Sequence, residues 1–332
     1  MAGRRTNLAL AVLLAIALVT GVVAFAVGTG SARPILVLHG VAALSIVLLM
    51  PWKSVIARRG IRRKREGNAL STVLAVLTVV ALISGIAHSV FNVESVGPLA
   101  IMQIHVTAAV GALVLGAAHV RQRPQRIHRS DLSRRNFLRT GSLAAAALVG
   151  YFAVEGAVGA AGLPGASRRF TGSHERGSFD PASMPVTSWI NDTAPTRGAV
   201  AGLTIETPNG TTGWALEDLA AFDDAVTATL DCTGGWHATQ DWSGVRLERL
   251  LDRSGSSVRV VSATGYERRF AMGDVGDLLL ASHAGAAPLS PGHGAPLRLV
   301  APGRRGFWWV KWVDRVIVDD RPAWWQPPFP LT

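Results

Sequence analysis

The single cysteine of this 332-residue chain, Cys232, lies in a stretch that reads LDCTGGWHATQDW over residues 230–242. One cysteine forms no intrachain disulfide, so Cys232 is a packing residue, a reactive thiol or a metal ligand. A thiolate is a soft ligand, and coordination to a metal keeps it deprotonated. The pair Gly234-Gly235 lets the backbone approach a large cofactor closely. The stretch therefore favours either a small buried hydrophobe or the ligand of a metal cofactor.

A second motif follows as HGAPLR (residues 293–298) and VKW (residues 310–312). The two motifs in this order resemble the molybdopterin-binding domain of the sulfite oxidase family, over most of residues 185–332. The resemblance implies that Cys232 is the protein ligand of molybdenum beside one molybdopterin, with Thr233 in the same cofactor-binding stretch. The residues matched to those that hold the pterin and its phosphate are His293, Arg298 and Lys311.

The loop PGRRG (residues 302–306) lies between the two halves of the second motif. Arg304 and Arg305 are candidate cofactor-binding residues, because backbone N–H groups and a guanidinium suit an anion. The alternative is a basic surface turn. Lys311 is expected in an aromatic strand over residues 307–312, where a charge without a partner would be costly.

The residues after Cys232 bear on the substrate. Sulfite-oxidising members of the resembled family hold the oxyanion with arginines here, whereas this chain has Thr233 to His237, and VTSWIN (residues 186–191) replaces an upstream Arg-Asn-His stretch. Trp236 and His237 are therefore substrate-side candidates, or else pack around the pterin. The resemblance to bacterial members with aromatic pockets favours reduction of a small S-oxide or N-oxide over oxidation of sulfite.

The charge of the chain is divided unevenly. Residues 1–165 contain 17 Lys and Arg against 4 Asp and Glu, and residues 166–332 contain 16 against 18. In the first half the basic residues alternate with long apolar runs, which indicates a membrane protein and not a nucleic-acid-binding one. The runs, each expected to be a helix that crosses roughly 30 Å of hydrocarbon, span residues 7–28, 34–51, 70–91 and 98–120.

The loops between these runs predict their orientation. Residues 53–66 and the segment after residue 120 are strongly basic, so both ends of the four-helix unit are expected in the cytoplasm. SRRNFL (residues 133–138) resembles the twin-arginine export motif, which implies the twin-arginine translocase as a partner; ordinary flanking charge is the alternative. A weakly apolar run over residues 142–162 follows, expected as an uncleaved fifth helix, with cleavage as the alternative.

Histidines in the apolar runs are candidate haem ligands, since ionisable residues within membranes are functional hypotheses by default. His39 and His105 lie near the outer helix ends, and His119 follows His105 on nearly the same face, roughly 21 Å away. This resembles the paired-histidine pattern of four-helix b-type cytochromes, which implies an outer haem b on His39 and His105, with His88 as substitute or neighbour. The inner position lacks a second ligand, because Lys53 stands there. Hydrogen bonding between helices is the alternative.

The predicted fold is an all-α transmembrane bundle of four helices plus a fifth anchor helix, followed by an α+β, mainly β, domain of the sulfite oxidase type. Its predicted parts are a four-helix unit (1–122), a basic segment with the fifth helix (123–165), a linker (166–184) and the molybdopterin domain (185–332). Within that domain the pattern predicts strands at 201–206, 258–262 and 297–300 and short helices at 216–222 and 247–252.

We therefore expect a bacterial, multi-pass enzyme of the cytoplasmic membrane whose C-terminal domain lies outside the cytoplasm. Oxygen-atom transfer on a small-molecule substrate would exchange electrons with membrane quinone or quinol through the haem. Two alternatives stay open: helices that serve only as an anchor, with a separate redox partner, and a binding protein that has lost the metal.

Overall fold

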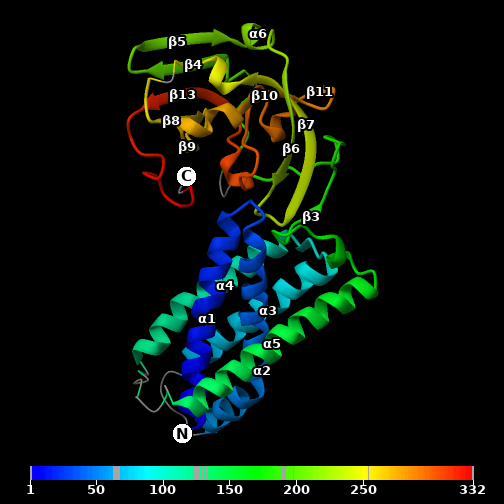
Figure 1. The fold of residues 1–332 in the computed structure, drawn as a ribbon, viewed down its shortest axis with the longest axis vertical. Coiled ribbons are helices and arrows are strands. Elements are labelled where there is room, and N and C mark those ends of the chain that lie inside the picture. The colour runs from blue at the N-terminus through cyan, green and yellow to red at the C-terminus, as the bar shows by residue number, and fades with distance from the viewer. Residues whose placement is uncertain are drawn as a thin grey trace. The chain divides into compact units, whose positions relative to one another are not determined.

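The computed structural model describes residues 2–62, 68–122, 124, 128, 131, 133–188, 192–196, 198–252 and 254–330. The chain divides into two compact units, Met1–His174 and Glu175–Thr332. Figure 1 shows helices in the first unit and mainly strands in the second.

The first unit contains long apolar helices, as the hydropathy pattern predicts. Each is long and apolar enough to cross a membrane by length and composition, which is compatible with a membrane-anchored N-terminal region. The helices are α1 (Ala2–Ala26), α2 (Ala32–Arg62), α3 (Asn68–Phe91), α4 (Ile101–Gln122) and α5 (Arg134–Ala160). Helix α2 continues through Pro51 instead of ending there, because a proline removes one helical hydrogen bond without excluding helix on its C-terminal side.

The helices pack as two hairpins, α1 on α2 and α3 on α4, and α5 packs on α2. A short ladder of β1 (Ser95–Val96) and β2 (Leu99–Ala100) joins α3 to α4. Small residues allow the close approach: a Cβ at Gly150 would lie 2.8 Å from Leu44 Cδ2. The helices thus pack through small side chains, with larger apolar ones facing outward.

The chain after α5 folds back against the C-terminal end of α3. The 3₁₀ helix η2 (Pro164–Ser167) begins it, and Arg168 donates to Ser89 O at 3.2 Å and forms an ion pair with Glu155. Much of the predicted linker, residues 166–184, has no regular secondary structure, and it includes β3 (His174–Glu175).

The second unit is built from two sheets. One has the order β5-β4-β13-β8-β9, in which β4 and β13 are parallel and the other pairs are antiparallel. Its strands are β4 (Gly202–Thr207), β5 (Gly210–Ala215), β8 (Ser257–Ser262), β9 (Glu267–Ala271) and β13 (Val313–Asp319). In the other, β7 pairs with β6 and β10, and β10 pairs with β11 and β12. These strands are β6 (Asp224–Asp231), β7 (Trp236–Arg246), β10 (Leu279–Ala284), β11 (Ala287–Pro288) and β12 (Arg298–Val300).

Side chains from both sheets form one hydrophobic core, which includes Leu203 of β4, Val258 of β8, Trp242 of β7 and Leu280 of β10. The expected mixed, mainly β architecture is confirmed, as are the predicted strands. The short helices are present as α6 (Leu216–Leu219) and the 3₁₀ turn η3 (Leu247–Arg249), with further 3₁₀ turns η4 (Met272–Asp277) and η5 (Pro291–His293).

The aromatic strand predicted at residues 307–312 is wrong. The segment begins as the 3₁₀ turn η6 (Gly306–Trp308), and Trp312 has a φ of 52°, which breaks extended backbone. Its aromatic residues fill the core from a loop, and the strand begins one residue later, at Val313.

Candidate functional site

Cys232 lies in the tight connection from β6 to β7. Its N–H donates to Trp236 O at 2.9 Å, and Gly235 N donates back to Cys232 O at 3.2 Å. Gly235 has a φ of 95°, which glycine adopts without strain. The connection turns the cysteine side chain inward, where it is 8% exposed.

The thiol is buried and lies close to a backbone donor. Burial raises the pKa of Cys232, against the lowering effect of the Gly234 N–H group, which lies 3.3 Å from Sγ, and of the Arg305 charge. The loop that contains Gly306 packs directly on this turn, because a Cβ at Gly306 would lie 3.1 Å from Cys232 Cα. A thiol in this place is neutral at pH 7 unless a metal coordinates it.

Arg305 lies next to Cys232, where the carboxylate of Asp231 neutralises its charge. Its Nη1 lies 2.5 Å from Asp231 Oδ1, and both side chains are at most 5% exposed. Its Nη2 donates to Cys232 O at 3.4 Å. This buried ion pair joins the loop at 302–306 to the end of β6, so Arg305 holds the turn that carries the thiol.

Arg298 is a buried cation beside the same thiol. It is 3% exposed, its Nη1 donates to His293 O at 3.0 Å, and its guanidinium lies over the rings of Trp242 and Trp309 at 5.5 and 5.7 Å. Burial lowers its pKa to about 10, so it stays protonated at neutral pH. Among the residues the structure describes, Arg298 has no carboxylate partner and its Nε has no acceptor.

Lys311 is a second buried cation, 9% exposed. Its Nζ donates to Gly292 O at 2.6 Å and to Thr187 O at 2.9 Å. Burial, followed by repulsion from Arg298, lowers its pKa to about 8. No ion pair to Lys311 occurs within the described part of the chain.

His293 lies with these cations, but its ring is already bound by the protein. Nε2 donates to Met184 O at 3.0 Å, and Nδ1 lies 2.9 Å from Ser290 Oγ. Burial lowers its pKa, so the ring is neutral at pH 7. The backbone of His293 serves a second purpose, because His293 O accepts from Arg298 and holds that guanidinium.

Trp236 and His237 begin β7 immediately after the thiol. Trp236 Nε1 donates to Thr187 Oγ1 at 3.0 Å, so this indole is anchored to the segment that also receives Lys311. His237 is half-buried and opposite Asp231 in the β6–β7 register. Thr233, in the turn itself, is half-buried. Of the upstream stretch VTSWIN, residues 189–191 lie outside the described residues.

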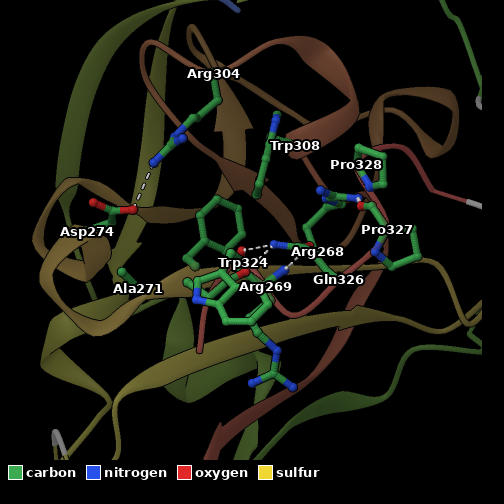
Figure 2. A pocket seen from close by; sticks show the side chains of 12 residues that line it. Arg268, Arg269, Ala271, Asp274, Arg304, Trp308, Trp324, Gln326, Pro327 and Pro328 are labelled. Atoms are coloured by element: carbon green, nitrogen blue, oxygen red, sulfur yellow. Dashed lines mark hydrogen bonds and ion pairs between the residues drawn. The ribbon is translucent and has the colours of Figure 1, made fainter. Parts of the chain in front are cut away.

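Arg304 points away from Cys232. Its Nη2 lies 2.8 Å from Asp274 Oδ2, and both side chains are more than 40% exposed. Figure 2 shows Arg304 at a surface hollow together with Asp274, Trp308 and Arg268. The hollow has a volume of about 370 Å³ and is also lined by Trp324, Gln326, Pro327 and Pro328. The structure therefore gives the predicted pair Arg304 and Arg305 opposite directions, and only Arg305 faces the thiol.

Three further residues shape this site. Asp231 pairs with Arg305, and Thr187 receives both Lys311 and Trp236. Gly294 has a φ of 109°, and a Cβ there would lie 3.2 Å from the Cβ atoms of Arg298 and Lys311. Asp231 directly precedes Cys232, and this position could have pointed to it in the sequence. The contacts of Thr187 and Gly294 could not be predicted, because they depend on loops that meet only in the folded protein.

In the helical unit, His39 of α2 and His105 of α4 face each other, with ring centroids 6.1 Å apart and planes at 74°. His39 Nδ1 donates to Ala17 O at 2.9 Å, and His105 Nδ1 donates to Ala81 O at 2.8 Å. A carbonyl only accepts, so each Nδ1 carries the proton and each Nε2 keeps its lone pair. This is the state in which imidazole binds a metal.

The other predicted histidines are placed elsewhere. His88 Nε2 lies 3.1 Å from Gly172 O, and its ring packs edge-on against His174 at 5.0 Å. His88 therefore fastens the chain after α5 to α3. His119 Nδ1 lies 3.3 Å from Ser71 Oγ, at the opposite end of α4 from His105.

The second unit thus places a buried thiol beside two buried cations that have no carboxylate partner among the described residues, an arrangement that suits an anionic, sulfur-rich metal cofactor. Residues 199–325 match the family model described as the oxidoreductase molybdopterin binding domain. No group of three or more His, Cys, Asp and Glu that could hold a metal ion occurs among the described residues.

Comparison with known proteins gives similar relatives. The chain is 30% identical over 151 residues to mitochondrial sulfite oxidase of Rattus norvegicus, covering 34% of this chain and 28% of that protein. It is 31% identical over 103 residues to inducible nitrate reductase [NADH] 1 of Glycine max, covering 25% of this chain and 12% of that protein. The structure of the sulfane dehydrogenase SoxCD from Paracoccus pantotrophus aligns with a TM-score of 0.36 and 28% identity over 39% of this chain and 40% of that one.

The family match, over residues 199–325, lies within the second unit. The chain spans 12% of the length of that nitrate reductase and 28% of the length of that sulfite oxidase. Residues 199–325 are thus similar to oxidoreductase molybdopterin-binding domains.

Proposed function

We propose that this protein is a membrane-anchored molybdenum-cofactor enzyme that transfers an oxygen atom to or from a small molecule outside the cytoplasm. The observation that carries the proposal is the buried Cys232 thiol beside two buried cations without carboxylate partners among the described residues. An unpaired buried cation is costly, so Arg298 and Lys311 are expected to meet an anion that the protein itself does not supply.

The residues fit the group. Cys232 would provide the sulfur ligand, and Arg298 and Lys311 would hold the phosphate and pterin. The cofactor supplies two-electron chemistry at molybdenum, while this chain places and charges its surroundings. Arg305 and Asp231 keep the thiol-bearing turn in place through their buried pair.

We favour a neutral S-oxide or N-oxide as substrate. Substrate would meet Trp236 and His237, which follow the thiol directly, and no arginine occupies residues 233–237. Arg305, the arginine that reaches this turn, is neutralised by Asp231, so it offers little net charge to an oxyanion. The relatives named sulfite oxidase and nitrate reductase make oxidation of sulfite the second candidate.

A substrate screen on the purified full-length protein tests this choice. With a reduced dye, we expect turnover of dimethyl sulfoxide, methionine sulfoxide or trimethylamine N-oxide, each consuming two electrons and two protons and releasing water. Turnover of sulfite alone, with an oxidised dye, would overturn the assignment of direction.

We also propose that His39 and His105 bind one haem b, through which electrons pass between membrane quinol and the molybdenum domain. The facing rings, each with Nδ1 held by a carbonyl, support this. A reduced-minus-oxidised spectrum with a Soret and α band that His39→Ala and His105→Ala both remove is the expected result. Protein from haem-replete cells without these bands would leave the helices as an anchor alone.

Export by the twin-arginine translocase remains part of the proposal. Arg134 and Arg135 lie in the first turn of α5, directly before the apolar part of that helix. Replacing both by Lys should retain the second unit in the cytoplasm, as judged by its protection from protease added to the outside of spheroplasts. Unchanged exposure to protease would reduce the two arginines to flanking charge.

A further inference from the structure

The four helices α1 to α4 contain an internal repeat. Residues 7–26 of α1 and 71–90 of α3 align without a gap and share Leu-Ala-Val-Leu. The two helices also share the pattern Ala-Leu-Val/Ile-Thr/Ser-Gly, at residues 17–21 and 81–85. Helices α2 and α4 share Ile-x-x-Leu/Ile-His-x-x-Ala-Ala, which begins at Ile35 and Ile101. The hairpin α1–α2 is thus repeated as α3–α4.

The repeat extends to the side-chain contacts. His39 Nδ1 lies 2.9 Å from Ala17 O and 3.2 Å from Thr20 Oγ1. The corresponding atoms in the second hairpin are equally close: His105 Nδ1 lies 2.8 Å from Ala81 O and 3.4 Å from Ser84 Oγ. Thr20 and Ser84 are both buried, at 7% and 3% exposure.

The glycine that ends each pattern lies against its histidine ring. A Cβ at Gly21 would be 3.2 Å from His39 Cε1, and a Cβ at Gly85 would be 3.1 Å from His105 Cε1. Such contacts are tighter than side chains normally allow, so a larger residue would displace the ring. The glycine lets the imidazole lie on the neighbouring helix while its Nδ1 reaches the carbonyl one turn earlier.

At the opposite ends of the two hairpins, the same pairs of positions are in contact, but the residue types differ. Lys53 Nζ donates to Asn7 Oδ1 at 2.9 Å, and His119 Nδ1 lies 3.3 Å from Ser71 Oγ. Lys53 and His119 correspond in the repeat, as do Asn7 and Ser71. A protonated lysine does not bind iron. Of these two repeat-related pairs in the described helices, His39 and His105 form the one that presents two equivalent imidazoles.

We infer that Thr20-Gly21 and Ser84-Gly85 form a duplicated positioning device that fixes the proton and orientation of His39 and His105, so that two repeat-related Nε2 atoms bind one haem iron from opposite sides. The inference rests on the proposed haem. The device acts through the histidines: the carbonyl fixes the tautomer, the hydroxyl supports it and the glycine sets the position of the ring.

The first experiment compares glycine variants of the full-length protein in membranes. Gly21→Ala and Gly85→Ala are each expected to weaken haem retention roughly 5- to 150-fold, the equivalent of overpacking one side chain. Gly156→Ala is the matched control, because it lies in α5 with no atom within 4 Å of the added Cβ. Haem per polypeptide is measured by pyridine haemochrome absorbance, and the ligand field by low-temperature EPR.

The second experiment removes the hydroxyls without adding bulk. Thr20→Val and Ser84→Ala should weaken support for the Nδ1 proton, make the imidazole a poorer donor to ferric iron, and raise the midpoint potential. Thr78→Val is the control, since its hydroxyl donates to Leu74 O at 2.8 Å on the same helix as Ser84. These variants keep the test open if the glycine variants fail to insert.

The outcomes separate the two claims. Wild-type protein without haem, or with haem that persists in His39→Ala and His105→Ala, contradicts both the haem proposal and the device. A second outcome contradicts the device alone. In that case the histidine variants lose haem, but Gly21→Ala, Gly85→Ala, Thr20→Val and Ser84→Ala all retain haem with the wild-type midpoint potential and EPR signature. Parallel shifts in the two hairpins, with silent controls, support it.

Discussion

Replacement of Arg298 by methionine separates cofactor binding from protein stability. The guanidinium is 3% exposed, with a single acceptor in the described residues, His293 O at 3.0 Å. Methionine fills similar volume without charge. Because an unpaired buried cation disfavours the folded state, Arg298→Met should leave the thermal stability of cofactor-free protein unchanged or raised.

The same change should lower cofactor retention strongly. A charge-assisted hydrogen bond contributes about 1.5–3 kcal/mol, so losing one contact to the cofactor's phosphate weakens binding roughly 10- to 150-fold. The assay is the fluorescence of the oxidised pterin per polypeptide after gel filtration of the full-length protein. Arg304→Met is the matched control, because Arg304 pairs with Asp274 at the surface hollow and not with the thiol site.

Two results would refute this reasoning. Equal pterin content in Arg298→Met and Arg304→Met would show that the buried guanidinium does not hold the cofactor. A large loss of stability in cofactor-free Arg298→Met would show that Arg298 has a structural role that its surroundings do not indicate.

Further predictions concern the neighbours of Arg298. The pKa of Lys311 is about 8 without cofactor, and the protonated form binds an anion, so cofactor affinity should fall up to tenfold per pH unit above about pH 8. Pterin release measured against pH checks this prediction. Lys311→Arg should flatten the pH profile, because arginine stays protonated over this range. Asp231→Asn should lower the free energy of unfolding by about 3–5 kcal/mol, because it breaks a buried ion pair. The control Asp274→Asn breaks a surface ion pair and should lower it by less than about 1 kcal/mol. Thermal unfolding of the two variants tests this difference. Gly294→Ala should lose pterin, because the added Cβ would lie 3.2 Å from the Cβ atoms of Arg298 and Lys311. Gly265 also has a positive φ but has open space around it, so the control Gly265→Ala should keep its pterin. Equal pterin content in the two variants would contradict the role of Gly294.

The sequence predicts the helical unit well because hydrophobic length is a local property. The five apolar runs and the helices agree, and the main difference is the continuation of α2 through Pro51 to Arg62. Proline disfavours helix at and before its own position, and the residues that follow it are free to continue.

The second unit shows where local patterns fail. Residues 307–312 are as aromatic as a buried strand, but they leave extended geometry at η6 and at Trp312. The aromatic composition of residues 307–312 predicts that they are buried, but it does not predict whether they form a strand or a turn. That choice depends on the positions of the neighbouring loops.

The candidate site divides in the same way. The family resemblance of the two motifs predicts that Cys232, Arg298 and Lys311 belong to one site, and the structure places both buried cations near the Cys232 thiol. The direction of a side chain in a loop is not a local property: Arg304 and Arg305 are adjacent and identical, yet one pairs with Asp274 and the other with Asp231. The facing of His39 and His105 similarly depends on how two hairpins pack.

The central claim is that Cys232 is a ligand of molybdenum, and X-ray absorption at the molybdenum edge tests it most directly. The account predicts one sulfur ligand fewer in Cys232→Ser than in wild-type protein, at equal pterin content. An unchanged number of sulfur ligands in that variant, or wild-type protein that contains pterin but no molybdenum, would contradict it.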